Sequence, residues 1–380
     1  MKNTKITVEC EVVTPLFLYG ADGQTPEIRI PSLKGMIRYW WRAANADLGL
    51  KQLKESENLT FGGVSKESKQ ENKNKIGKSK VIMRLINYND KSNTSYLWKE
   101  LRFSNESSFK QTTEYSGLKY LLYSLLLKNS KQYIKTGTKF NVEFKANNSD
   151  DLEKAMIGLL FLQFFGAIGA RNRRGAGSIK INSFIENNSN IECINLFDTH
   201  SIKDKASLVN RYIELSKLIN NTTEKSYSVL KGSRIFVFNY KETWYDALEF
   251  IGKKFKYFRD NNRSNIYDVA NFGFPIIHRN KTKIIAGKME KNKLKEIKRR
   301  LSPFIFKVIK INENMFFPIV IYLNGNLIND EFRIMKALDK SSKDKLREDK
   351  FKKLPKLKSD IIKKFITYLT DGNEYKEITI

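Results

Sequence analysis

Cysteine and histidine are scarce in this sequence. Its 380 residues include two cysteines, Cys10 and Cys193, and two histidines, His200 and His278. Two thiols are too few for a disulfide framework or a four-thiolate zinc site, and their number fits a reducing compartment. Two imidazoles are too few for the common metal sites of histidine. We therefore expect no metal and no other cofactor.

Long apolar runs are also missing. The most hydrophobic stretch, residues 157–170, is shorter than the roughly 20 residues that a membrane-crossing helix needs. Residues 1–6 alternate polar and apolar side chains and lack the apolar centre of a secretion signal. These two absences predict a soluble cytoplasmic protein that has no membrane partner.

Basic residues outnumber acidic residues by a wide margin. The chain has 69 Lys and Arg against 41 Asp and Glu, which gives a formal net charge of +28. An excess of this size repels itself unless a polyanion offsets it, so a partner that carries phosphates is the simplest explanation. A lysine-rich composition that only decorates the surface is the alternative, and the charge alone leaves it open.

The hydrophobic patterns predict an α+β fold with two ferredoxin-like (RRM-like, split βαβ) modules that carry long basic insertions. We expect the first module at residues 1–190 and the second at residues 191–380. The strands expected in the first module are 5–14, 81–86, 138–145 and 178–184, and its helices are 36–48, 118–127 and 151–165. Ser32 and either Asp150 or Asp151 are the expected N-caps of two of these helices.

The second module has a weaker pattern. Its expected strands are 234–240, 303–310, 317–323 and 375–380, and its expected helices are 202–219, 244–258 and 360–369. Three segments show no clear period and are interpreted as insertions, at 62–80, 87–114 and 259–300.

A loop rich in glycine and arginine is the strongest local signal, at residues 166–177. Glycines let the backbone approach an anionic strand closely, and arginines supply planar cations that suit phosphate. The loop follows an expected helix and precedes an expected strand, which is the reverse of a dinucleotide-binding fingerprint. The predicted RNA-binding residues of this loop are Gly166, Gly169, Arg171, Arg173, Arg174 and Gly175. A mobile turn with surface arginines is the alternative.

A basic stripe is expected on the first helix. Lys34, Arg38 and Arg42 recur at intervals of four residues and therefore share one helical face, and Arg29 lies just before them. We predict that these four cations bind phosphates, although a solvated helix face would show the same spacing. The adjacent pair at 40–41, both tryptophan, is expected in the core rather than against RNA bases.

No set of residues predicts catalysis. His278 lies in an apolar segment without a nearby carboxylate, and no paired-carboxylate motif stands out. Residues 77–79 imitate the end of a P-loop, but Asn72 stands where that motif requires its first glycine. Residues 231–238 partly imitate an RNA-recognition octamer, but their aromatic side chains are out of register. We therefore expect that the protein is not an enzyme.

Several segments of the sequence, which we call blocks, together resemble the RAMP superfamily. The resemblance is most specific over residues 14–42 and 165–178, and it is weaker at 61–63, 79–81 and 299–304. Within that superfamily the chain is most similar to the subunit-one family of the Cmr complex, the type III-B CRISPR effector. Because Arg300 lies in the late block, it joins the candidate RNA-binding residues.

The resemblance implies a binding subunit of a ribonucleoprotein in antiviral defence. Such a subunit lies near the 3′ region of the guide RNA and helps to engage target RNA. Its implied partners are guide RNA, target RNA and the other Cmr complex subunits, and cleavage is assigned in that family to other subunits. Two alternatives remain open: a RAMP-type guide-processing endoribonuclease, and a general nucleic-acid-binding protein outside CRISPR.

Overall fold

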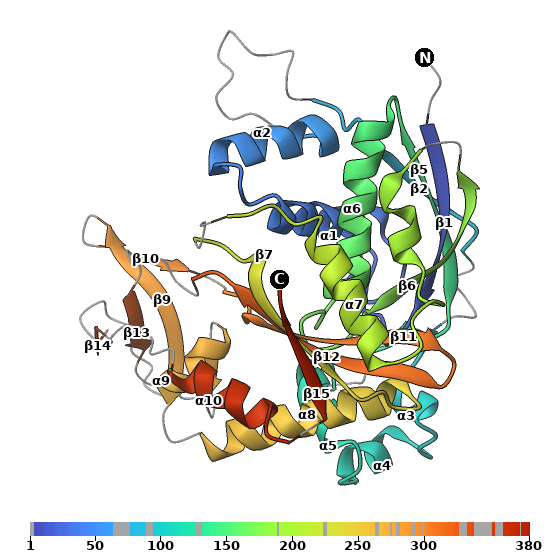
Figure 1. The fold of residues 1–380 in the computed structure, drawn as a ribbon. Helices are drawn as coiled ribbons and strands as arrows, with labels where there is room; N and C mark the ends of the chain where they lie inside the picture. The colour runs from blue at the N-terminus through green and yellow to red at the C-terminus, as the bar shows by residue number, and fades with distance from the viewer. Residues whose placement is uncertain are drawn as a thin grey trace.

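Two four-stranded antiparallel sheets organise the chain (Figure 1). The computed structural model describes residues 4–63, 77–88, 94–126, 131–187, 190–222, 226–262, 266–273, 276–278, 282–290, 293–297, 300–326, 333–337, 352–353, 360–372 and 374–380. Helices and strands are mixed along the whole of this length, so the expected α+β class is confirmed.

The first sheet has the strand order β2-β5-β1-β6. Its strands are β1 (Thr4–Val12), β2 (Ile82–Ile86), β5 (Lys139–Ala146) and β6 (Ile179–Asn187), close to the expected ranges. Alternate residues of β1, such as Ile6 and Val8, are fully buried because they face α1 (Ile30–Ala44) and α6 (Ser149–Phe165). The opposite face carries polar side chains, including Glu143 between Lys5 and Lys145.

Both expected helix caps were wrong. Helix α1 begins at Ile30, so Ser32 lies inside its first turn, and the N-cap Arg29 makes no side-chain cap. Pro31 explains the early start, because the first turn does not use its missing N–H and its fixed φ suits a helix. Helix α6 is capped by Asn148, whose side-chain oxygen accepts the N–H of Asp151 at 2.8 Å.

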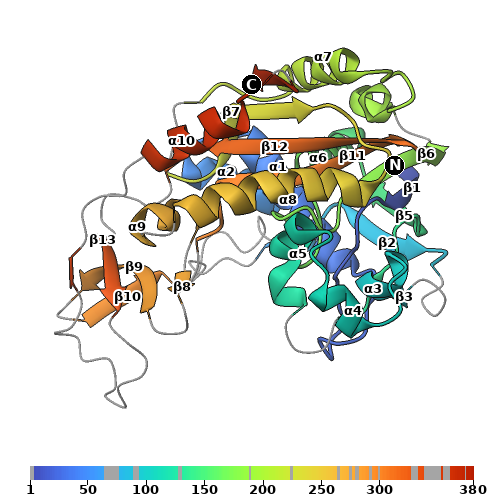
Figure 2. The same ribbon diagram turned by 90° about the horizontal axis from the view of Figure 1, so that it is seen from below.

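The second sheet has the strand order β11-β12-β7-β15. Its strands are β7 (Val229–Phe238), β11 (Phe304–Asn312), β12 (Met315–Asn324) and β15 (Tyr375–Thr379). Helices α8 (Trp244–Asn261) and α10 (Asp360–Leu369) cover one face, as Figure 2 shows from below, and α1, α6 and α7 (Lys205–Ser216) lie toward the other. Both faces are therefore buried, and the strands are continuously hydrophobic rather than alternating with polar residues.

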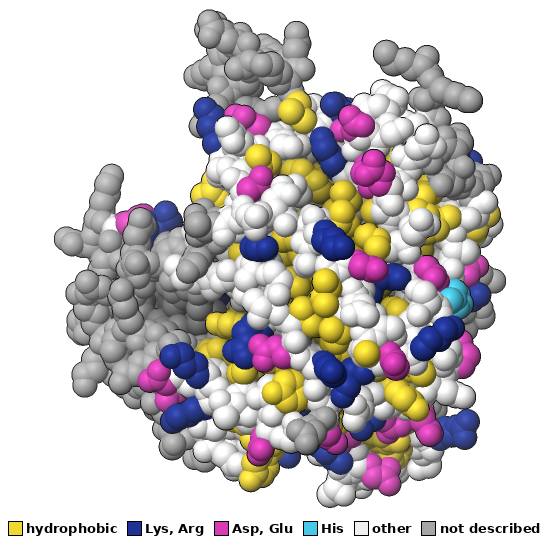
Figure 3. Space-filling view, viewed as in Figure 1, with side chains coloured by type: hydrophobic (Ala, Val, Ile, Leu, Met, Phe, Trp, Pro, Cys, Tyr) yellow, Lys and Arg dark blue, Asp and Glu magenta, His cyan; other side chains and the backbone are white. Residues whose placement is uncertain are grey.

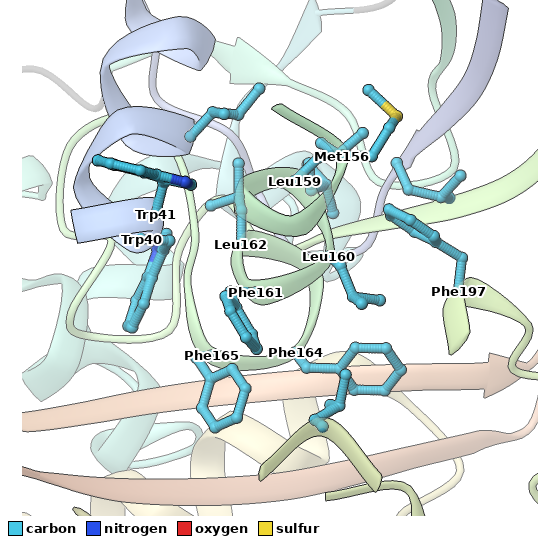
Figure 4. Close-up of a cluster of buried hydrophobic side chains, with 14 of the residues drawn as sticks. Trp40, Trp41, Met156, Leu159, Leu160, Phe161, Leu162, Phe164, Phe165 and Phe197 are labelled. Atoms are coloured by element: carbon cyan, nitrogen blue, oxygen red, sulfur yellow. The ribbon is translucent and has the colours of Figure 1, made fainter. Parts of the chain in front are cut away.

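The main hydrophobic core lies between the two sheets, around α6. Figure 4 shows Trp40 and Trp41 of α1 beside the leucines and phenylalanines of α6, with Phe197 packed on the far side. Trp40 is 1% exposed and Trp41 is 3% exposed, so the expectation that both tryptophans belong to the core is confirmed. The helix that carries the predicted basic stripe is therefore anchored to both halves of the chain.

Smaller elements lie in the segments interpreted as insertions and in the connections between the main strands and helices. They are α2 (Leu50–Phe61), β3 (Thr94–Ser95), α3 (Leu97–Glu100), α4 (Glu106–Gln111), α5 (Ser116–Leu122), η1 (Tyr123–Leu125), β4 (Tyr133–Ile134), η2 (Glu192–Phe197), α9 (Ile266–Val269), η3 (Ala270–Phe272), β8 (Ile276–His278), β9 (Thr282–Glu290), β10 (Lys293–Ile297), β13 (Arg333–Ala337) and β14 (Lys352–Lys353). Strands β8, β9, β10, β13 and β14 form a further sheet. Most of the loop expected at 62–80 lies outside the described residues. None of the described helices is long and apolar enough to cross a membrane.

Candidate nucleic-acid interface

Three blocks that are distant in the sequence meet at Arg173 of the glycine-rich loop. Its guanidinium donates hydrogen bonds to the hydroxyl of Tyr39 on α1, at 2.8 Å, and to the carbonyl of Ser302 just before β11. Burial lowers the pKa of Arg300, and the like charge of Arg173 lowers it further. Arg300 also donates to the carbonyl of Asn326 at 2.7 Å. The structure thus brings α1, the loop and the late block together.

The glycines of the loop provide close packing. A Cβ on Gly166 would lie 2.1 Å from Nε1 of Trp40, and a Cβ on Gly175 would lie 2.2 Å from Cδ2 of Leu248 on α8. Both distances are far below a normal carbon contact, and Gly175 also has a φ of +90°, which favours glycine. Gly169 likewise lies against the carbonyl of Phe17. The loop carries its glycines because neighbouring elements press on it from both sides.

Backbone hydrogen bonds hold the loop on both sides. The N–H groups of Ala170 and Gly177 donate to Phe17 at 2.8 Å and to Pro15 at 3.0 Å. On the opposite side, the N–H of Phe306 in β11 donates to the carbonyl of Arg173 at 3.2 Å. The N–H groups of Ala170 and Gly177 are therefore already bonded within the protein and are not available to a phosphate.

The three arginines of the loop have different surroundings. Arg171 is half-buried, and its Nε donates to the hydroxyl of Ser124 at 2.7 Å. Arg174 turns inward, with its guanidinium carbon 4.6 Å from the ring of Phe255 and 5.3 Å from that of Phe306. Its Nη1 is buried without an acceptor among the described residues, and burial lowers its pKa to about 9. These surroundings favour a packing role for Arg174, and its assignment as a phosphate ligand stays a prediction, as do those of Arg171 and Arg173.

The basic stripe of α1 forms as predicted, but its cations already have partners. Lys34 donates from Nζ to the hydroxyl of Ser79 at 2.5 Å and to the carbonyl of Val81 at 3.1 Å, and burial lowers its pKa. Arg38 lies 2.6 Å from Oε1 of Glu57, and Arg42 binds the same oxygen. The stripe therefore does not consist of solvated, independent charges.

Glu57 on α2 is the important side chain that sequence analysis missed. It is 6% exposed and faces two guanidinium groups with one carboxylate, so the cluster keeps one excess positive charge. The sequence contained a signal for this position: Leu53, Glu57 and Phe61 are spaced four residues apart, which places them on one face of a helix. Arg29, at the start of α1, lies 3.3 Å from Glu27.

Neither of the two histidine side chains is described at this junction. His200 is exposed in a different part of the chain, where its backbone N–H donates to Asp198 at 2.8 Å. His278 lies in β8, and its side chain is outside the description. Among the described residues, no group of three or more His, Cys, Asp or Glu is placed to hold a metal ion.

On at least one face of the molecule, positive and negative side chains are mixed (Figure 3). On the face shown in Figure 3, Lys and Arg side chains alternate with Asp and Glu. Many of the described surface pairs are of this kind, such as Lys253 with Glu249 and Arg234 with Glu377. Charge on such a mixed surface attracts a polyanion less than a cluster of like charges does. Arg173 and Arg300 differ from these pairs, because the charge of Arg173 lowers the pKa of Arg300.

Comparison with known proteins finds relatives in one superfamily. Residues 9–180 match the RAMP superfamily. The chain is 27% identical over 296 residues to CRISPR system Cmr subunit Cmr1-1 of Pyrococcus furiosus, which covers 75% of this chain and 77% of that protein. It is also 27% identical over 191 residues to subunit Cmr1-2 of the same organism, covering 46% of this chain and 92% of that protein. The resemblance inferred from the sequence is confirmed.

Solved structures share the fold along almost the whole chain. The crystal structure of Cmr1 from Pyrococcus furiosus in its apo form superposes with a TM-score of 0.61 at 21% identity, covering 99% of this chain and 98% of that one. A chain of the cryo-EM structure of the type III-B Cmr-beta complex bound to cognate target RNA superposes with a TM-score of 0.55 at 14% identity, covering 97% and 100%.

Proposed function

We propose that this member of the RAMP superfamily is a non-catalytic RNA-binding subunit of a type III-B CRISPR (Cmr) ribonucleoprotein effector. Its place is near the 3′ region of the guide RNA, where it helps to engage target RNA in antiviral defence. Its partners are guide RNA, target RNA and the other Cmr complex subunits. Relatives named as Cmr1 subunits, and a similar chain in a complex bound to cognate target RNA, support this proposal.

The meeting of the three sequence blocks at Arg173 carries the proposal. Arg173 is held by Tyr39 and Ser302, so its guanidinium is fixed in place before any ligand arrives. The charge that acts most on Arg300 is the like charge of Arg173, and a phosphate between the two would relieve their repulsion. Positioned arginines recognise the RNA backbone, while base pairing between guide and target supplies the sequence specificity.

We also propose that each four-stranded sheet and its two helices form a ferredoxin-like module. In the first, the chain order is β1, α1, β2, β5, α6, β6, and in the second it is β7, α8, β11, β12, α10, β15. Numbered within its own module, each sheet has the order 2-3-1-4 with antiparallel neighbours. This is the arrangement of the split βαβ fold.

The non-catalytic role remains part of the proposal. A guide-processing endoribonuclease would need an acid–base residue beside bound RNA, and His200 lies instead near Phe184 and Phe197, on the β6 side of the first sheet. We also propose a cytoplasmic location, which fits two buried free cysteines. Incubation of the purified chain with guide and target RNA, with and without Mg²⁺, should leave both RNAs intact. Cleavage that is lost in His278→Ala would favour the endoribonuclease.

Native purification tests the proposed function directly. The chain is purified from its own cells under mild salt, and the RNAs and proteins that copurify are identified by sequencing and mass spectrometry. We expect CRISPR guide RNAs and other Cmr subunits in stoichiometric amounts. A preparation with mixed RNA and DNA and without stable partner subunits would contradict the proposal and favour a general nucleic-acid-binding protein.

A further inference from the structure

A half-open pocket lies where the three blocks meet. Its volume is about 70 Å³, and its wall includes Met36, Trp40, Ala167, Arg173, Leu301 and Ile305. These residues come from α1, the glycine-rich loop and the start of β11, so the pocket exists only because both halves of the chain pack together. A single ordered water needs roughly 10–15 Å³ by a comparable measure, so the pocket has room for part of an organic ring.

The wall of the pocket suits a flat, mostly apolar group with hydrogen-bonding edges. Its exposed lining is mainly apolar and includes the half-buried ring of Tyr39, while Trp40, only 1% exposed, lies behind it. The indole N–H of Trp40 is buried beside Gly166 and has no acceptor among the described residues. A nucleobase combines a stacking face with acceptor atoms on its edges, whereas an aliphatic side chain offers only the apolar contact.

The mouth of the pocket is positively charged. Arg173 belongs to the wall, and its charge acts on Arg300 closely enough to lower the pKa of that residue. Leu301, which follows Arg300, is part of the wall and is 43% exposed. An apolar pocket with two guanidinium groups at its edge is complementary to a nucleotide, whose base and phosphate are joined by one sugar.

We infer that this pocket receives one unpaired base of an RNA strand, with the adjacent phosphate at Arg173 and Arg300. The inference rests on the proposed RNA-binding function and adds to it a defined base subsite. Because the wall offers stacking and few fixed polar groups, the pocket accepts a base by its shape and does not read extended sequence. It sets the register of the strand on the protein.

Site-specific photocrosslinking locates the base. RNAs with one 4-thiouridine at each successive position of the guide or the target are assembled into the complex, irradiated and mapped by mass spectrometry. We expect one position, and not its neighbours, to crosslink to a peptide that contains Tyr39 and Trp40 or Leu301. Crosslinks to this chain that all map elsewhere would overturn the base pocket while leaving RNA binding intact. An assembled complex in which this chain acquires no crosslink at any position would overturn both proposals.

An affinity cycle then measures the contact. An abasic sugar at the crosslinked position should weaken RNA binding about 5- to 150-fold, the range for loss of one stacked base. Leu301→Asp places a carboxylate at the mouth and should weaken binding of the intact RNA, but the abasic sugar should then cause little further loss. The control Ile213→Asp changes a side chain of similar exposure, 46%, on α7 and should keep the full abasic effect. Equal abasic effects in both variants would refute the pocket, as would a side chain of a neighbouring subunit found in it.

Discussion

Arg174 lies between α8 and β11, with its guanidinium over the rings of Phe255 and Phe306. We predict that Arg174→Ala lowers the free energy of unfolding by about 1–3 kcal/mol, because cation–π contact and the packing of the side-chain stem are both lost. Arg174→Met keeps most of the packing and should retain stability. Denaturant unfolding of the two variants checks this. Full stability of Arg174→Ala together with weaker RNA binding would show that the residue is a phosphate ligand after all.

Lys307 is a fully buried lysine on β11 that donates to the carbonyl of Gly166. Burial lowers its pKa from 10.5 to about 7. Between these two pH values the unfolded chain binds more protons than the folded chain, so stability should rise with pH by at most about 1.4 kcal/mol per unit. Below pH 7 Lys307 is charged in the folded and in the unfolded chain, so the full cost of burying the charge then lowers stability. The difference in unfolding free energy between wild type and Lys307→Met, measured from pH 6 to 10, should show this rise, and a flat difference would contradict it.

At the level of elements, the pairing of α1 with α2 controls how much charge the basic stripe presents. We predict that Glu57→Gln raises RNA affinity by on the order of a few-fold at low salt, because Arg38 and Arg42 lose their shared counter-charge. The matched control is Glu214→Gln, which removes the partner of Arg211 on α7. RNA affinity measured at several salt concentrations should separate the two variants. Equal affinities would exclude the stripe from the interface.

The elements show what a single sequence can predict. Strict alternation in β1 and β5 identified both strands, since one face of that sheet is apolar and the other polar. The caps of α1 and α6 were misassigned because Ser32 and Asp151 are good caps in isolation, while the true boundaries depend on Pro31 and Asn148. Helix α5 packs on α8, more than 120 residues further along the chain, and no local pattern predicts this contact.

At the scale of the whole molecule, the sequence located the three blocks but not their contacts. Arg173 and Ser302 are 129 residues apart, and nothing in their local patterns says that they touch. The sequence located the glycine-rich loop. It could not tell whether a glycine there makes room for a phosphate or for a tryptophan ring, because both reasons lead to the same residue. Which arginine turns inward depends on the aromatic side chains of α8 and β11, so Arg171 and Arg174 could not be distinguished beforehand.

The salt dependence of RNA affinity tests the central claim, that the junction around Arg173 binds the RNA backbone. Affinity of the assembled complex is measured across a salt series for wild type, for Arg173→Gln with Arg300→Gln, and for the control Arg84→Gln with Arg234→Gln, which removes the same charge elsewhere. We predict that the junction variant flattens the log–log slope by roughly 1.4, about 0.7 for each lost phosphate contact, while the control keeps the wild-type slope. Identical slopes for the two double variants would contradict the account.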